Sequence, residues 1–443
     1  MPTKIKWTIS VLLFGITISF MVLPRLIGSV IHGVISDQIF EQINSSTDGR
    51  IGIVDPRLET GWFRSTIQLN IEISNGRQLT EPYYLSLQGN ISHGPILLTQ
   101  PSLSFGLASV DLVADAGRFE SKFADISIDL LTASFLIKFD QSLFLNLAVP
   151  GIDVLNLENN IASVINELDV QLEIEEDLST LAYIKADKVS FQNNQSDVEL
   201  MFIDPSMSAT TNIFGQTSSA SRISAKIPLV DASDPLSFNI RNIDFEWRSD
   251  PSSMRPGLTD FSQDIQIKKI ESELPLESMS WKSEIKGIKQ EVITSYIKML
   301  KSIQYTTGTD PISKLSELTQ VGNEIGLLLL QNEIKLKNIL EIDLYQGIHK
   351  LEFNILWQGL PNIQNIDHFK FEDGLGALNV GIDLLLNQES LSISPFANLT
   401  ELYISQGYLL SSPSGEDLIL KAELREGKAF INNENYPLQG ILQ

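Results

Sequence analysis

The sequence predicts a mainly β protein with some α structure: one or more large antiparallel sheets and a helical hairpin, preceded by one N-terminal transmembrane helix. Three observations lead to this fold class. Residues 7–23 form a run without charge. Apolar and polar residues alternate along many later segments, as they do on a half-buried strand. Residues 291–330 instead place apolar residues at helical spacing.

The uncharged run from Trp7 to Leu23 predicts a membrane anchor. At helical rise it covers about 25 Å of a roughly 30 Å hydrocarbon core, and apolar residues beyond Pro24 can extend it. Two lysines precede the run, so we expect the N-terminus in the cytoplasm. No small-x-small cleavage site follows, which favours an uncleaved anchor over a signal peptide. The side chains expected in the membrane include Trp7, Leu12, Leu13, Phe14, Phe20 and Leu23.

Three regions follow from the change of hydrophobic period. Residues 1–45 comprise the N-terminus, the anchor and a juxtamembrane helix; residues 46–290 form a first β lobe; residues 291–443 hold the helical hairpin and a second β region. Alternation is clearest over residues 66–73 and recurs at 126–130, 170–174, 279–281, 351–357 and 418–424. One polar face per strand predicts antiparallel sheet with a solvated side. Strands do not alternate with helices, which disfavours a doubly wound α/β fold.

The helical hairpin is predicted from two apolar stripes. The first runs from Val292 to Ile303, and the second from Ile312 to Leu329. Between them, Asp310-Pro311 has the pattern of an N-cap followed by a proline at the first helical position. We expect this hairpin to cover an edge or face of the sheet, and a mobile lid is the alternative.

Composition excludes several classes of function. The formal net charge of −23 repels nucleic-acid phosphates, so no nucleic-acid partner is expected. The chain has no cysteine, and its four histidines lie far apart without metal-binding spacing. Neither a GxSxG nucleophile motif nor a glycine-rich phosphate loop is present. We therefore predict no catalytic, cofactor-binding or metal-binding residues, and no enzymatic activity.

Three short segments carry a family resemblance. They are Gly61-Trp62-Phe63-Arg64-Ser65, His93-Gly94-Pro95 and Gly106-Leu107-Ala108-Ser109. Together with residues 426–432 near the end, they resemble the YdgA-like family of bacterial envelope proteins, a domain of unknown function. The resemblance implies a Gram-negative inner-membrane anchor of single-pass type and a periplasmic β-rich domain. It implies no activity, cofactor or catalytic residue.

The His93-Gly94-Pro95 element also has a plain structural interpretation. Glycine permits a positive φ and proline fixes the next φ, so the pair predicts a tight turn that ends one strand and redirects the chain. No carboxylate lies within a few positions of His93, so no polarised acid–base pair is indicated. The alternative is a functional, pH-sensitive histidine. We expect all the family-motif residues to be structural.

Two classes of function are favoured, and an enzyme is a third, less favoured class. The first is a non-enzymatic envelope protein that binds an apolar or amphiphilic ligand, or a client polypeptide, in a sheet-lined groove. The second is a structural or assembly factor that contacts other envelope proteins through sheet edges. The expected partners are the inner membrane, through the N-terminal helix, and a lipid or an envelope protein. A continuous apolar channel would favour the ligand, whereas a filled core would favour the scaffold.

Overall fold

A computed structural model describes residues 22–29 and 51–436, apart from 74–82, 99–102, 115–116, 121–123, 141, 178, 194–197, 212–219, 234–236, 253–254, 274 and 297–310. The chain divides into two compact units. Unit 1 comprises Met1–Phe214 with Ser233–Pro235, and unit 2 comprises Gly215–Ala232 with Leu236–Gln443. The predicted lobe boundary after residue 290 falls inside unit 2.

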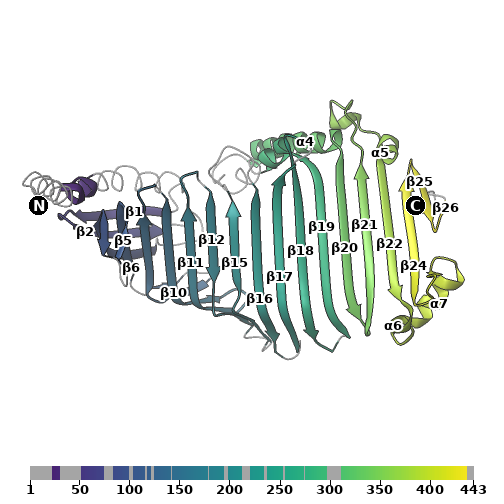
Figure 1. The fold of residues 1–443 in the computed structure, drawn as a ribbon, viewed down its shortest axis with the longest axis horizontal. Coiled ribbons are helices and arrows are strands. Elements are labelled where there is room, and N and C mark those ends of the chain that lie inside the picture. The colour runs from purple at the N-terminus through teal and green to yellow at the C-terminus, as the bar shows by residue number, and fades with distance from the viewer. Residues whose placement is uncertain are drawn as a thin grey trace, which may run out of the picture. The chain divides into compact units, whose positions relative to one another are not determined.

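Unit 1 is an antiparallel β structure (Figure 1). Its main sheet runs in the order β1, β2, β3, β6, β9, β10 and β11, so several sequence neighbours are also neighbours in space. The strands of unit 1 are β1 (Ile51–Glu59), β2 (Arg64–Ile73), β3 (Tyr83–His93), β4 (Ile96–Leu98), β5 (Leu103–Phe105), β6 (Ala108–Ala114), β7 (Gly117–Glu120), β8 (Ala124–Ile128), β9 (Leu131–Ile137), β10 (Leu143–Asn156), β11 (Ile161–Ile174), β12 (Thr180–Lys185), β13 (Lys188–Asn193), β14 (Val198–Ile203) and β15 (Ser206–Thr211).

The two long strands β10 and β11 fork the sheet of unit 1. The first half of β10 pairs with β9, whereas its second half pairs with β8. Along β11, residues 169–174 pair with β12 and residues 161–166 pair with β13. Near this divide Glu167 adopts a φ of 51°, a left-handed conformation that bends the strand.

The core of unit 1 lies between β1, β2, β3 and β6. Its buried side chains come from alternate strand positions, as period-two patterning requires. They are Ile67, Leu69, Leu87, Ile91 and Ala114, with half-buried apolar neighbours packed around them. The alternating segment at residues 66–73, which the sequence analysis singled out, therefore forms β2 and supplies part of this core, as predicted.

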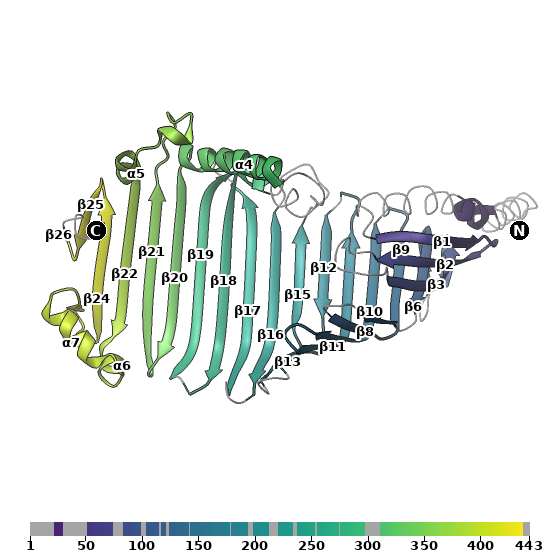
Figure 2. The same cartoon turned by 180° about the vertical axis from the view of Figure 1, so that it is seen from behind.

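Unit 2 is an antiparallel meander of long strands (Figure 2). Hydrogen-bonded neighbours run in the order β16, β17, β18, β19, β20, β21, β22, β24, β25 and β26, with β23 added beside β24. The bounds are β16 (Ser221–Ala232), β17 (Phe238–Pro251), β18 (Leu258–Glu271), β19 (Leu276–Lys289), β20 (Ile334–Leu344), β21 (Gly347–Trp357), β22 (Leu378–Asn387), β23 (Leu410–Ser411), β24 (Asp417–Arg425), β25 (Lys428–Ile431) and β26 (Glu434–Tyr436).

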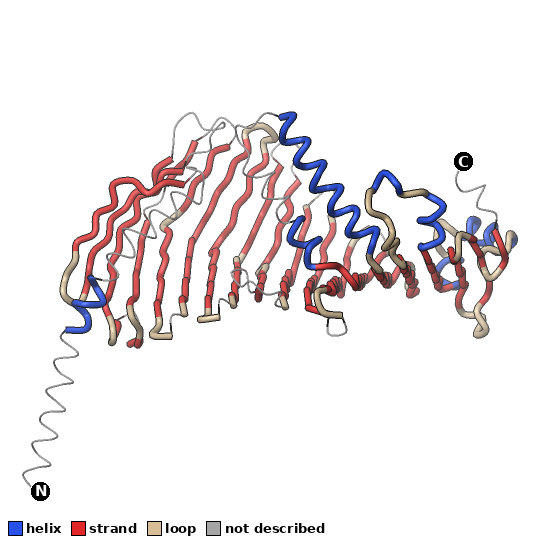
Figure 3. Tube along the Cα trace, turned by 90° about the horizontal axis from the view of Figure 1, so that it is seen from above, coloured by secondary structure: helices blue, strands red, loops and turns tan. Residues whose placement is uncertain are grey.

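Helices flank the sheet of unit 2 at both ends of its strands. They are α4 (Pro311–Gln331), η2 (Ile366–His368), α5 (Phe371–Ala377), α6 (Gln388–Ser392) and α7 (Ala397–Ser405). Both views place α4 and α5 at one end of the strands and α6 and α7 at the other. Figure 3 shows the strands of unit 2 as a single layer from which α4 extends. Trp357 joins α4 to this layer, because its indole nitrogen donates to the carbonyl of Leu330 at 3.1 Å.

The fold class is confirmed as mainly β with a large antiparallel sheet and few helices. Pro311 begins α4, which confirms the second helix of the predicted hairpin, and residues 290–296 are helical where the first was expected. The proposed N-cap Asp310 and the turn between the helices lie outside the described residues. So do the anchor residues Trp7, Leu12, Leu13, Phe14 and Phe20, whereas Leu23 lies in the helical segment 22–29. Within the described part of the chain, no helix combines the length and apolarity needed to cross a membrane.

Candidate functional site

The three family-motif segments come together at one corner of unit 1. Gly61 to Ser65 leads into β2, His93 ends β3, and Ala108 begins β6, which is the next strand of the sheet. The backbone nitrogen of His93 donates to the carbonyl of Phe63 at 2.9 Å. Within the sheet His93 pairs with Ala108. The segments therefore form one cluster, although up to several tens of residues separate them along the chain.

His93 occupies the buried centre of this motif cluster. Its Nε2 atom lies 3.0 Å from the hydroxyl oxygen of Ser65, and both residues are almost fully buried. Burial lowers the pKa of His93 below its usual value of 6.5, while the carbonyl groups of Trp62 and Pro24 act in the opposite direction. The neutral imidazole is therefore the stable form in the folded protein at neutral pH.

The helical segment 22–29 packs directly against His93. Pro24 and Gly28 are the two buried residues of this segment. A β-carbon at Gly28 would stand 2.4 Å from the Cε1 atom of His93, so the helix approaches the imidazole as closely as only glycine allows. Nearby, the guanidinium of Arg25 lies 5.6 Å from the centre of the Trp62 ring, a cation–π contact. His93 thus joins this helix to the sheet.

Gly94 is required for a different reason from the one predicted. The sequence suggested a positive φ, but Gly94 does not adopt one, and the Gly94–Pro95 peptide bond is cis. A β-carbon at Gly94 would lie 1.8 Å from the carbonyl oxygen of Gly106. The amide of Gly94 also donates to the carbonyl of Leu107 at 2.8 Å. The glycine therefore permits close contact between two backbone segments, and the expected tight redirection of the chain remains.

The motif cluster brings a serine hydroxyl and a neutral imidazole together in a buried site. A serine hydroxyl beside a neutral histidine could in principle act as a nucleophile with its base. Here both groups are sealed from solvent, and no carboxylate is among the groups that perturb the His93 pKa. Ser109 is also buried, at 2 % exposure. By contrast, Trp62 and Phe63 beside the cluster are more than half exposed.

The sheet of unit 2 has a mostly apolar face. We define the apolar face by a central row of paired residues that crosses the strands from β16 to β24. Cross-strand pairing places these side chains next to one another, in the order Ala225, Phe245, Ile265, Trp281, Leu340, Leu351, Leu384 and Leu420. A second apolar row on the same face lies four residues along each strand and contains Phe261, Ile285, Leu336, Ile355, Val380 and Leu424. Between the two rows, Gln263, Ser283 and Asn338 form a short polar stretch.

The apolar face is only partly covered. Between β17 and β21, none of the strand residues has a fully buried apolar side chain, although every one of these strands is described along its length. Trp281, in the middle of the central row, is 39 % exposed. A sheet that formed one side of a filled core would bury such residues completely. Among the residues that the structure describes, the apolar side chains of these strands therefore remain partly exposed.

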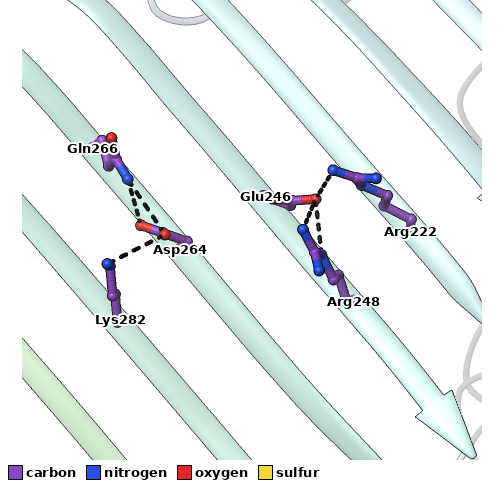
Figure 4. Close-up of polar contacts among 6 residues, drawn as sticks. All are labelled: Arg222, Glu246, Arg248, Asp264, Gln266 and Lys282. Atoms are coloured by element: carbon purple, nitrogen blue, oxygen red, sulfur yellow. Dashed lines mark hydrogen bonds and ion pairs between the residues drawn. The ribbon is translucent and has the colours of Figure 1, made fainter.

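The opposite face of the same strands is charged and paired with itself. We call it the ion-paired face. Glu246 on β17 contacts both Arg222 and Arg248, and Asp264 on β18 contacts Lys282 on β19 (Figure 4). The hydrogen bond from Arg248, followed by the nearby arginine charges, holds the pKa of Glu246 below its usual value. Further pairs join Lys337 with Glu352 and Lys421 with Asp383. The charged side chains named here are paired with one another, so this face is suited to contact with water.

A shallow groove on the ion-paired face is lined by charged side chains that are already paired. It has a volume of about 460 Å³ and forms where Gly381 contributes no side chain, between Asn354 and Glu423. Its cations are already paired, with Lys335 3.2 Å from Glu333 and Lys337 2.9 Å from Glu352. No group of histidine, aspartate and glutamate residues in the described part of the chain is arranged to hold a metal ion.

A second buried serine–histidine pair, which the sequence analysis missed, lies in unit 2. The Nε2 atom of His349 on β21 lies 3.0 Å from the hydroxyl of Ser390 on α6. Gly347 makes room for α6, because a β-carbon there would stand 2.6 Å from the Ser390 side chain. No local signal could reveal this pair, since its two members are 41 residues apart and neither sits in a recognisable motif.

Comparison with known proteins identifies a family for this chain. No curated protein and no solved structure matches it significantly. A family profile described as a bacterial protein of unknown function, DUF945, matches residues 24–355. The matched region begins at the buried Pro24, includes the motif cluster and extends through β20 into β21. Because this match covers most of its length, the chain belongs to the DUF945 family of bacterial proteins of unknown function.

Proposed function

We propose that this protein is a non-enzymatic envelope protein that binds an apolar or amphiphilic ligand along the apolar face of unit 2. The observation that carries the proposal is the uninterrupted central row, in which apolar side chains follow one another across neighbouring strands while remaining partly exposed. With strands spaced about 4.8 Å apart, such a row is roughly 30 Å long, which suits an extended acyl chain.

The contrast between the two faces supports this proposal. An exposed apolar surface of this extent costs free energy in water unless a ligand or partner covers it. The ion-paired face of the same strands carries its charges in mutual contacts and needs no partner. An amphiphile with its hydrocarbon portion on the apolar face would remove that portion from water and leave its polar group at the rim.

We also propose that the protein is anchored in the inner membrane, with its N-terminus in the cytoplasm and its β units in the periplasm. The uncharged run from Trp7 to Leu23 and the lysines before it support this topology. The helical segment 22–29 continues directly from that run and packs on His93. The motif cluster would then fasten the anchor to unit 1.

Site-specific photo-crosslinking in living bacteria tests the ligand proposal. A photoreactive amino acid replaces Leu340, on the apolar face between Trp281 and Leu351. The matched control replaces its neighbour Ile339, on the ion-paired face between Lys282 and Glu352. After irradiation of the full-length protein in its membrane, the crosslinked species are analysed by mass spectrometry.

The expected result is a lipid adduct at position 340 and none at position 339. Equal labelling at both positions, or no lipid at either, would contradict the proposal. Adducts to another envelope protein at position 340 would instead favour the alternative function, a structural or assembly factor. Both arms use adjacent residues of one strand, so protein abundance and the lipid environment are the same for each.

A further inference from the structure

A second apolar surface lies at the C-terminal side of unit 2, on and around α6 and α7. Its large apolar side chains are between 37 % and 65 % exposed. We call it the helical patch, and its members are Ile393, Phe396, Leu399, Leu402, Tyr403, Ile404 and Leu410. Together they expose on the order of several hundred Å² of apolar surface, the size that marks an interaction site on a monomer.

The helical patch is organised along one side of α7. Phe396, Leu399 and Tyr403 recur at intervals of three and four residues, so they share a helical face with Leu402 beside them. A surface helix normally turns such a stripe toward the core, but α7 has no buried residue. The helix therefore presents its apolar side outward.

The segment that carries the patch is firmly seated. Asn387 caps α6 by accepting from the amide of Ser390 at 2.9 Å, and the Ser390 hydroxyl contacts His349. Leu391 of α6, Leu409 after α7 and Leu418 of β24 form a buried cluster. The residues on either side of α7 are thus packed into unit 2, whereas α7 itself has no buried residue and stays exposed.

Charge indicates which kind of surface the patch can meet. From Gln388 to Leu420 the chain has no lysine or arginine, and the helices carry Glu389 and Glu401. Carboxylates without compensating cations are repelled by anionic lipid headgroups. Uncharged serine, threonine and asparagine side chains make up much of the remaining helix surface. This combination is compatible with a zwitterionic interface.

We infer that α6 and α7 dock on a zwitterionic lipid bilayer, with the helical patch inserted at the boundary between headgroups and acyl chains. Amphipathic helices lie at membrane surfaces with the apolar side buried at this boundary, and their binding strengthens with the apolar area that they bury. A stable protein interface needs about 800 Å² per partner with matching shape. The patch is smaller, and a lipid surface adapts its shape to it.

The absence of cysteine from the chain permits a direct test with single labels. Leu399→Cys carries an environment-sensitive fluorophore in the patch. Lys226→Cys, an exposed position on β16 in the same unit, carries it in the control. Each full-length protein is reconstituted in phosphatidylcholine vesicles. Brominated phosphatidylcholine, which quenches the fluorophore on contact, is placed either in these vesicles or in protein-free vesicles added afterwards.

We expect quenching of the label at position 399 to exceed quenching of the label at position 226 severalfold with at least one of the two placements of brominated lipid. Quenching by the protein's own vesicles would show contact with the bilayer that holds the protein, and quenching by the added vesicles would show contact with a second bilayer. Admixture of anionic phosphatidylglycerol should weaken it, and Phe396→Ser with Leu402→Ser should abolish it. The inference would be overturned if brominated lipid left the Leu399 label unquenched in both arms. It would also be overturned if quenching depended on the amount of protein per vesicle and not on the brominated lipid. Neither result bears on crosslinking at Leu340, so the two proposals fail separately.

Discussion

The hydroxyl of Ser65 lies 3.0 Å from Nε2 of His93 and joins the start of β2 to the end of β3. The two residues are 28 positions apart and both are buried. Their contact ties together two segments of the family motif, and the helical segment 22–29 rests on the same imidazole. The Ser65–His93 contact is therefore expected to stabilise unit 1.

Replacing Ser65 by alanine should lower the free energy of unfolding by about 1–3 kcal/mol, because the Nε2 atom of His93 would lose its partner inside a buried site. Chemical denaturation of the full-length protein measures this change. Thr66→Ala is the matched control, since Thr66 is exposed on the opposite face of the same strand, and it should shift stability by less than about 0.5 kcal/mol. Equal effects of both substitutions would argue against a stabilising role of the Ser65–His93 contact.

Gly94→Ala should disrupt folding of unit 1. The added carbon would collide with the backbone carbonyl of Gly106, which cannot rotate away as a side chain can. We expect a loss of several kcal/mol, visible as a lower melting temperature or as insoluble protein. Gly376→Ala serves as the control, because that glycine lies in α5 with open space around it and alanine favours a helix. Normal melting of Gly94→Ala would refute the close-contact explanation.

Acidification should lower the free energy of unfolding, because His93 is buried as the neutral imidazole. Burial keeps its pKa below 6.5 in the folded protein, whereas the unfolded chain titrates near that ordinary value. Below this pH the unfolded chain binds the proton first, so the contribution of His93 is complete above about 6.5 and declines as pH falls toward the folded pKa. His93→Gln should remove this component. Melting curves of both proteins between neutral and mildly acidic pH give the difference, and parallel pH profiles would contradict the prediction.

The topology can be tested with a reporter fused after Gln443. An enzyme that is active only in the periplasm should be active in the fusion, and the mature protein should retain Met1–Leu23 as an uncleaved anchor. Mass spectrometry of the N-terminal peptide provides the second measurement. A shortened protein that is freely soluble in the periplasm would show that the segment is a cleaved signal peptide.

Local patterns in the sequence predicted individual elements well. The alternation of Ile67, Leu69 and Ile71 is found in β2, and Pro311 begins α4 where a first-turn proline was expected. Both signals depend on neighbouring residues only, because strand and helix periods are properties of the local backbone. They could therefore be recognised without knowledge of the rest of the chain.

The requirement for Gly94 could not be assigned correctly in this way. The sequence pattern Gly-Pro suggested a positive φ, whereas the structure shows contact with the carbonyl of Gly106. The partner belongs to another turn, beyond β4 and β5, and no property of residues 93–95 indicates its proximity. The same holds for His349 and Ser390, whose contact depends on where α6 returns to β21.

Leu340 and Ile339 are neighbours on β20 whose side chains lie on opposite faces of the sheet, and only the tertiary structure shows which face each one occupies. The sequence established a β-rich chain with one polar face per strand, because apolar and polar residues alternate within each segment. These two neighbours are both large and apolar, so the pattern alone does not distinguish their faces. Pairing with β19 and β21 places Leu340 between Trp281 and Leu351, and Ile339 between Lys282 and Glu352. Strand register, which depends on backbone hydrogen bonds between distant segments, decided that apolar residues of successive strands form one continuous row.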